Sequence, residues 1–198
     1  MSKITKQQLQ SYLWESANIL RGKIDSGDFK HYILGLLFYK RLSDVFDEEF
    51  EKLKKQVGEE LALDKSLYAD VFFIPVGCHW NDILSTSTNI GAKINEVFAK
   101  VTTANSPRLD GILDKIDFND KDKLSDAAMS DLVNHFNIHK LGNEFITGDM
   151  LGDAYEYLIA QFADDAGKKG GEFYTPHQIV ELLVEILQPQ EGQSIYDP

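Results

Sequence analysis

Cysteine is almost absent from this sequence. Cys78 is the only one among 198 residues, so an internal disulfide is impossible and a zinc cage of thiolates would lack its ligands. A lone cysteine is usually a small core residue, and no histidine is placed to activate the Cys78-His79-Trp80 triplet for nucleophilic catalysis. We therefore expect a fold held together by packing, without a metal site.

Long hydrophobic runs are also lacking. No apolar stretch approaches the ~18 to 20 residues needed to cross a bilayer, and the start MSKITKQQLQ lacks the apolar segment of a signal peptide. These absences predict a cytoplasmic protein without membrane contact. With 43% hydrophobic and 26% charged residues, the composition is that of an ordinary globular protein with a packed core.

Positive charge is scarce over most of the chain. The net charge of -12 argues against a surface that embraces DNA, because phosphate binding needs Lys and Arg. Residues 1–41, however, carry seven basic and three acidic side chains, a net charge of +4, which leaves -16 for the remainder. If any part faces phosphate, it is this one; the alternative is a solvated helical face with scattered lysines. The candidate DNA contacts are Lys3, Lys6, Arg21, Lys23, Lys40 and Arg41.

Hydrophobic periodicity predicts a mainly helical chain. Thr5 and Gln8 resemble a capping box, and Gly22 and Gly58 are natural ends for the first two helices. The second helix is apolar nearly all round over residues 29–42, which is typical of a central helix. Further helices are expected after Asn89 through Val101, after Ser125 through Phe136, and over residues 147–163.

Two stretches lack helical periodicity. Residues 71–74 form a short, partly β-branched run that stops at Pro75, which indicates an extended piece against the helices. Residues 106–123 are polar and rich in turn formers, which predicts a loop.

A polar, glycine-rich linker, DDAGKKGGEF, follows residue 163 and marks a domain boundary. We expect a helical domain over residues 1–165 and a second unit over 166–198. In the second unit, Thr175, Pro176 and Gln178 have the pattern of a helix start, and Pro189 stops that helix. The run 194–196 then predicts a strand.

Several strings carry a family resemblance. GKKGGEFYTP and the ending SIYDP resemble the N6-adenine DNA methyltransferases of type I restriction-modification systems. ILGLLFYKRLSDVF and LGDAYEYLIAQFA resemble the helical N-terminal domain of the same methylation subunits. The resemblance implies a mainly α chain: an N-terminal fragment in which a helical domain precedes the truncated start of a Rossmann-like α/β methyltransferase domain.

The resemblance also implies a cofactor pocket for S-adenosylmethionine. The N-terminus of a helix suits the carboxylate of that cofactor, and an aromatic ring can cover its sulfonium. Asp197 would lie at the carboxyl end of the first strand, where ligands bind in open α/β sheets. The alternative is that Thr175 only caps its helix, above packed aromatic rings. The implied cofactor residues are Glu172, Phe173, Tyr174, Thr175, Pro176, His177 and Asp197.

The catalytic element of the family is missing from the sequence. No Asn-Pro-Pro-aromatic or Asp-Pro-Pro-aromatic string occurs, and the family's glycine-rich turn would follow Pro198. The resemblance implies that the parent protein methylates N6 of a flipped adenine in duplex DNA. Because these elements are missing, we expect this fragment to be inactive, with weak or no cofactor binding. The implied partners are duplex DNA and the specificity and restriction subunits of the complex. The alternative is a noncatalytic helical protein-interaction module with a structural tail.

Two further polar groups invite a functional interpretation. His135 and His139 are four residues apart, but without a nearby Glu motif they are predicted to be a surface pair rather than zinc ligands. Asp47, Glu48 and Glu49 lack a cation-binding loop pattern and are predicted to be exposed helix surface.

Overall fold

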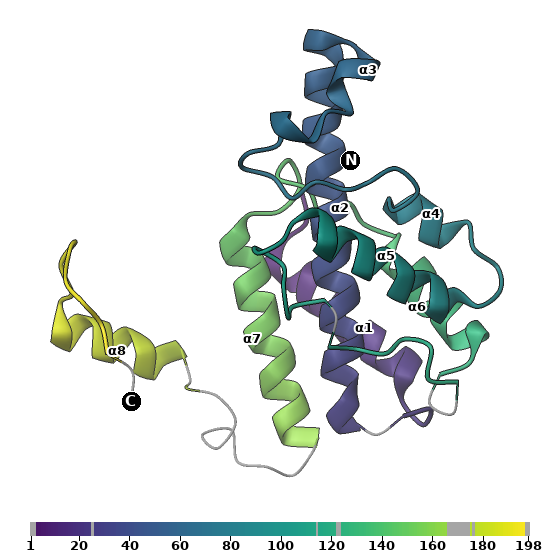
Figure 1. Cartoon of the computed structure of the whole chain (residues 1–198). Helices are drawn as coiled ribbons and strands as arrows, with labels where there is room; N and C mark the ends of the chain where they lie inside the picture. Colours follow the sequence, from purple (N-terminus) through teal and green to yellow (C-terminus); the bar gives the residue numbers. More distant parts are fainter. Residues whose placement is uncertain are drawn as a thin grey trace.

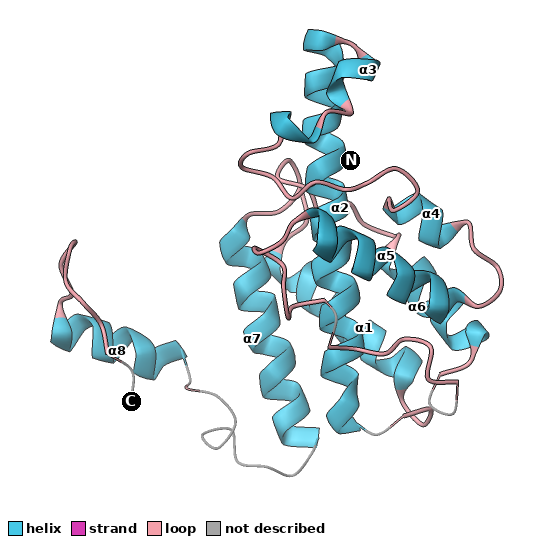
Figure 2. Ribbon diagram, in the orientation of Figure 1, coloured by secondary structure: helices cyan, strands magenta, loops and turns pink. Residues whose placement is uncertain are grey.

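The computed structural model describes residues 3–24, 26–113, 115–121, 124–165, 175 and 177–196. These residues form helices and loops, and no strand occurs among them (Figure 2). The fold is therefore mainly α, as predicted. The elements are α1 (Lys6–Leu20), α2 (Ser26–Val57), α3 (Glu59–Ala62), the 3-10 turn η1 (Lys65–Leu67), α4 (Trp80–Leu84), α5 (Ile90–Ala104), α6 (Asp126–Phe136), α7 (Gly148–Asp165) and α8 (His177–Leu187).

Helix α2 is the central element, as its all-round apolar pattern predicts. It contacts α1, α3, α4, α6 and α7 (Figure 1). Its side chains from Phe29 to Phe46 include many of the fully buried ones, such as Ile33, Leu36 and Tyr39. Burying a side chain of this size contributes about 1.5–3 kcal/mol, so α2 makes a large contribution to core stability.

The ends of several helices follow local sequence signals. Thr5 and Gln8 form the predicted reciprocal capping box of α1. Helix α2 ends where Gly58 takes a φ of 88°, a conformation that glycine adopts without a steric penalty. Ser125 caps α6 by accepting a hydrogen bond from the backbone N–H of Ala128. These three predictions are confirmed.

The start of α5 differs from the prediction. Asn89 precedes the helix, but its backbone is left-handed and its side chain forms no capping hydrogen bond. The side chain of Asp126 takes over this role from the first turn of α6, accepting hydrogen bonds from Asn89 N at 2.8 Å and Ile90 N at 3.3 Å. A carboxylate at this helix end is favourable because it faces unpaired N–H groups.

The segment before α4 is a loop rather than a strand. The side chain of Asn105, at the end of α5, binds both backbone groups of one residue in this loop: Phe73 N donates to Asn105 Oδ1 and Asn105 Nδ2 donates to Phe73 O, both at 2.8 Å. Cys78 is fully buried, as predicted for a small core residue. The extended piece is therefore fixed by a side chain and not by a neighbouring strand.

The two C-terminal helices differ in burial. Helix α7 packs on α1 and α2 and buries Ala154 and Leu158 completely. In α8, every side chain that the structure describes is exposed, including those of Leu182 and Leu187. The strand expected at 194–196 is not formed, and Ile195 and Tyr196 are 83% and 87% exposed. A strand needs a neighbour for its backbone hydrogen bonds, and the described residues provide none.

Membrane insertion has no candidate element in the described part of the chain, where each helix is too short or too polar to cross a bilayer.

Candidate functional site

The predicted cofactor turn lies largely outside the described residues. This applies to Glu172, Phe173, Tyr174, Pro176 and Asp197, and to the side chain of His177. Thr175 is described and exposed, and α8 begins two residues after it, as the capping pattern predicts. The assignment of these residues to a cofactor pocket remains a prediction.

Four of the six candidate DNA contacts are exposed cations near the two ends of α1. Lys3 and Lys6 lie at its start, and Arg21 and Lys23 follow its end. A helix of 15 residues spans about 22 Å. The four cations therefore form two separate groups rather than one continuous basic stripe.

Acidic side chains approach one cation of each group. Lys6 Nζ lies 2.7 Å from Asp153 Oδ2 of α7, and Lys23 Nζ lies 4.0 Å from Asp131 Oδ2 of α6. Exposed pairs of this kind contribute little to stability, about 0–1 kcal/mol, and leave the cation accessible to a stronger anion. All four exposed cations thus stay compatible with the predicted DNA contact.

Lys40 is not a surface cation, and its prediction as a DNA contact is wrong. Its side chain is completely buried and forms an ion pair with Asp44, one turn later in α2. Burial lowers the pKa of Lys40, whereas the Asp44 carboxylate opposes that shift. A count of charges along the sequence treats every lysine as exposed, and the apolar surroundings of α2 reverse this for Lys40.

Arg41 also forms its contacts within the protein. Its guanidinium is half-buried and donates hydrogen bonds to the backbone oxygen of Leu141 and to Asn143 Oδ1. These acceptors lie in the connection between α6 and α7. The second candidate on α2 therefore binds the chain's own backbone rather than an external phosphate.

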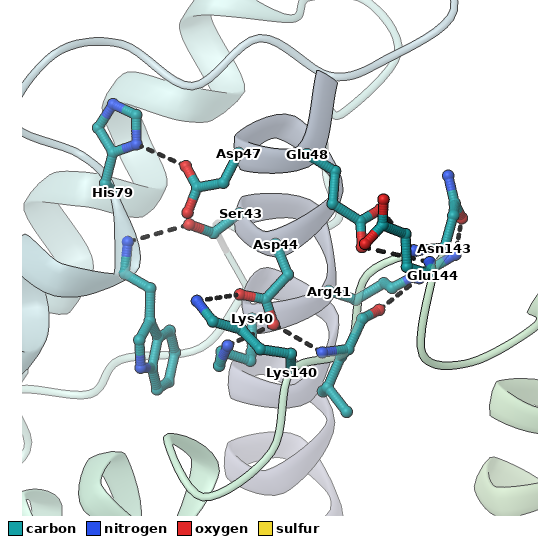
Figure 3. A network of polar contacts seen from close by, with 12 residues as sticks. Lys40, Arg41, Ser43, Asp44, Asp47, Glu48, His79, Lys140, Asn143 and Glu144 are labelled. Atoms are coloured by element: carbon teal, nitrogen blue, oxygen red, sulfur yellow. Dashed lines mark hydrogen bonds and ion pairs between the residues drawn. The ribbon is translucent and has the colours of Figure 1, made fainter. Parts of the chain in front are cut away.

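Arg41 belongs to a set of three α2 side chains that hold this connection, and we call Arg41, Asp44 and Glu48 the α2 clamp (Figure 3). Asp44 Oδ2 accepts a hydrogen bond from Leu141 N at 2.7 Å. Glu48 accepts hydrogen bonds from two further backbone amides, Asn143 N at 2.7 Å and Glu144 N at 3.2 Å. The spacing i, i+3, i+7 places all three on one face of the helix.

The clamp leaves no room for a side chain at residue 142. A Cβ on Gly142 would lie 1.9 Å from Glu48 Oε1 and 2.2 Å from Glu48 Cδ. The glycine thus allows the carboxylate to reach the amides of the two following residues.

The neighbouring face of α2 holds the start of α4. Ser43 Oγ accepts a hydrogen bond from Trp80 N at 3.0 Å, and Asp47 Oδ1 lies 3.0 Å from His79 Nδ1 (Figure 3). The hydrogen bond with Asp47 raises the pKa of His79. Asp47 and Glu48 are therefore structural acceptors, which corrects the prediction that they are simply exposed helix surface.

The two histidines of α6 and its following turn are not a surface pair either. His135 is only 9% exposed, stacks on the ring of Tyr12 and places its Nε2 2.7 Å from Tyr12 O. His139 meets the same ring edge-on. These contacts join α6 to α1, and among the described residues no three His, Cys, Asp or Glu side chains converge as metal ligands.

A cavity of about 410 Å³ lies between the N-terminal half of α2, the 112–116 loop and α7. Its lining is apolar apart from Lys30, His31 and Tyr155. A catalytic pocket usually combines apolar walls with converging polar groups. None of the clamp residues, and neither Ser43 nor Asp47, lines this cavity.

Two family models match consecutive parts of the chain. The HsdM N-terminal domain matches residues 9–136, and N-6 DNA Methylase matches residues 146–198. The second match begins just before α7. Residues 137–145, which lie between the matches, include the connection held by the α2 clamp.

The chain is similar to methylase subunits of type I restriction enzymes. It is 30% identical over 216 residues to the MpnII methylase subunit of Mycoplasma pneumoniae, which covers 90% of this chain and 39% of that protein. It is 28% identical over 209 residues to the MjaIX methylase subunit of Methanocaldococcus jannaschii, with 96% and 37% covered.

A solved structure has the same fold. The methyltransferase subunit of a type I restriction-modification system from Streptococcus thermophilus superimposes with a TM-score of 0.71 at 27% identity. The superposition covers 92% of this chain and 44% of that one. The chain thus spans less than half the length of these relatives.

Proposed function

The chain belongs to the HsdM N-terminal domain family, and from this premise we propose that the whole protein transfers a methyl group from S-adenosylmethionine to N6 of adenine in duplex DNA. The observation that carries the proposal is the order of the two family matches, a helical domain followed directly by the start of an N-6 DNA methylase. Within the protein, this chain supplies the helical body and the first turn of the cofactor pocket. The methyl-transfer motif belongs to the part that follows.

The cofactor turn at Tyr174 and Thr175 is the first point to test. Thr175 is exposed and lies two residues before the start of α8, whose first amide groups have no partner within the helix. Such a helix start attracts the carboxylate of an amino-acid ligand. In the full-length protein, Tyr174→Ala is expected to weaken binding of S-adenosylmethionine by calorimetry, whereas Gln190→Ala, in the exposed turn beyond α8, leaves it unchanged. Equal affinity in both variants contradicts the assignment.

The helical body has the second role, contact with DNA and with the specificity and restriction subunits. Support comes from the exposed cations at the two ends of α1. The test replaces one cation from each end, Lys3 and Lys23. A protein that loses two phosphate contacts shows a shallower salt dependence of DNA affinity, by about 1.8 units of slope. We expect this change in the assembled enzyme for the double variant Lys3→Glu and Lys23→Glu.

The matched control is the double variant Lys55→Glu and Lys65→Glu, because both lysines are exposed and the change in net charge is the same. If both double variants change the slope equally, net charge alone explains the effect and the α1 cations do not contact DNA.

Methyl transfer by the assembled full-length enzyme separates this proposal from a noncatalytic helical module. Incorporation of labelled methyl groups at N6 of adenine supports the enzyme. The residues that follow Pro198 in the natural gene are expected to include a Gly-x-Gly turn and a later Asn-Pro-Pro-aromatic string. Their absence, together with no methyl transfer, favours the module.

A further inference from the structure

Side chains of the central helix bind the connection between the two family matches through several hydrogen bonds. Asp44 and Glu48 of α2 accept hydrogen bonds from the amides of residues 141, 143 and 144, and Arg41 donates one to the backbone oxygen of Leu141. Lys140 Nζ adds an ion pair with Asp44 Oδ1 at 3.5 Å. The backbone of residues 141–144 is therefore held mainly by side chains about one hundred residues earlier in the chain.

The clamp contacts differ in their surroundings. Asp44 and Leu141 are buried, so their hydrogen bond is protected from water. Asn143 and Glu144 are exposed, and water could satisfy their amides, yet both donate to Glu48. Carboxylate acceptors form the stronger, charge-assisted hydrogen bonds, which fix the direction of the backbone as it leaves α6.

The clamped connection leads directly into α7, the first helix of the methylase match. Helix α7 begins at Gly148 and packs on α1 and α2 through buried Ala154 and Leu158. The ion pair between Lys6 and Asp153 adds a contact with α1. The first helix of the methylase match, α7, is thus attached to the helical body in two ways. The clamp holds the connection that precedes it, and its own side chains pack on α1 and α2.

We propose that the α2 clamp of Arg41, Asp44 and Glu48 sets the position of α7, and through α7 the position of the methylase domain relative to the helical body. The three are positioning residues, because the contacts that define them are with the connection between α6 and α7. The inference rests on the proposed function, since it assigns the clamp a part in presenting DNA to the methyl-transfer site.

The test uses the full-length protein assembled with its partner subunits. Glu48→Ala removes the acceptor of two amides, and hydrogen exchange at residues 143 and 144 is expected to rise about tenfold, the factor for one lost hydrogen bond. The methylation kcat is expected to fall on the order of tenfold, because misplacement of reacting groups by an ångström is costly. Affinity for S-adenosylmethionine is expected to stay unchanged.

Three further variants separate positioning from general stability. Glu51→Ala, one turn later on α2 and exposed, is the matched control and leaves exchange and kcat as in the wild type. Glu48→Gln keeps one acceptor oxygen and is expected to restore part of the exchange protection and part of the kcat. Arg41→Lys keeps the charge but loses the two-pronged contact with residues 141 and 143, and it serves as the second reporter if Glu48→Ala does not fold.

Each result bears on a separate part of the proposal. Unchanged exchange at residues 143 and 144 in Glu48→Ala overturns the clamp itself. Faster exchange with an unaltered kcat overturns the positioning role. If the wild-type assembly transfers no methyl group to any DNA, the proposed function fails and the positioning role fails with it, while the exchange data still report on the clamp separately.

Discussion

Adding one methyl group at Gly142 is expected to destabilise the protein because of the α2 clamp. The new Cβ would lie 1.9 Å from Glu48 Oε1, whereas comfortable contacts between heavy atoms need about 3.5 Å. The carboxylate must retreat by more than an ångström. It then loses its hydrogen bonds to Asn143 N, at 2.7 Å, and Glu144 N, at 3.2 Å.

The size of the effect follows from these two bonds. A hydrogen bond to a charged group contributes roughly 1.5–3 kcal/mol, but both amides are exposed and water replaces part of each bond. We expect Gly142→Ala to lower the free energy of unfolding by about 1–2 kcal/mol. Gly142 is not among the glycines with positive φ, so alanine fits its backbone. With Glu48→Ala in place, the same substitution should raise the free energy by about 0.4–1 kcal/mol, by restricting the unfolded chain.

Urea unfolding of the wild type, the two single variants and the double variant measures this reversal of sign. The expected coupling energy is roughly 1.5–3 kcal/mol, within the range for residues in direct contact. If the two substitutions are additive within about 0.5 kcal/mol, Glu48 does not occupy the space beside Gly142 and the clamp geometry is refuted.

Four other substitutions test separate parts of the fold. Gly91→Ala would place a Cβ 2.0 Å from the backbone oxygen of residue 118, and urea unfolding should show a loss of stability of about 2–3 kcal/mol. Gly152→Ala meets no atom within 4 Å and should instead stabilise α7 by about 0.5–1 kcal/mol. Equal effects of the two substitutions would contradict the close approach at α5. Asp126→Ala removes the acceptor of two amides at the start of α5 and should lower the free energy of unfolding by about 1 kcal/mol, with amide exchange at residues 89 and 90 as the local check. The hydrogen bond with Asp47 raises the pKa of His79 above 6.5. The contribution of this bond to the free energy of unfolding is therefore complete below pH 6.5 and is lost as the pH rises through the pKa of the folded state. If the same fall in stability over that interval persists in His79→Gln, this histidine is not its source.

The DNA contacts predicted from charge are compatible with the structure only where the side chain is exposed. Lys3, Lys6, Arg21 and Lys23 are on the surface, as a candidate DNA contact requires. Lys40 is buried, and Arg41 binds the connection after α6. The sequence contains a signal for the clamp, since Arg41, Asp44 and Glu48 recur at helical spacing. That spacing identifies a polar face of α2 but not the segment that covers it.

What the sequence determined by itself is the local structure. The capping box at Thr5, the cap at Ser125 and the end of α2 at Gly58 all depend on hydrogen bonds or backbone preferences within four residues. The apolar pattern of residues 29–42 likewise predicts the central place of this part of α2, because a helical stretch that is apolar nearly all round is buried. The sequence strings that carry the family resemblance also predict the order of the two domains.

Only the tertiary structure decided which distant groups meet. Arg41 and Leu141 are 100 positions apart in the chain, and the cap of α5 comes from Asp126, 37 positions beyond Asn89. Periodicity defines a face of each helix but not its neighbour. The burial of Lys40, the acceptor roles of Asp44 and Glu48, and the contact of His135 with Tyr12 were therefore fixed by helix packing, which brings together side chains whose separation in sequence has no regular value.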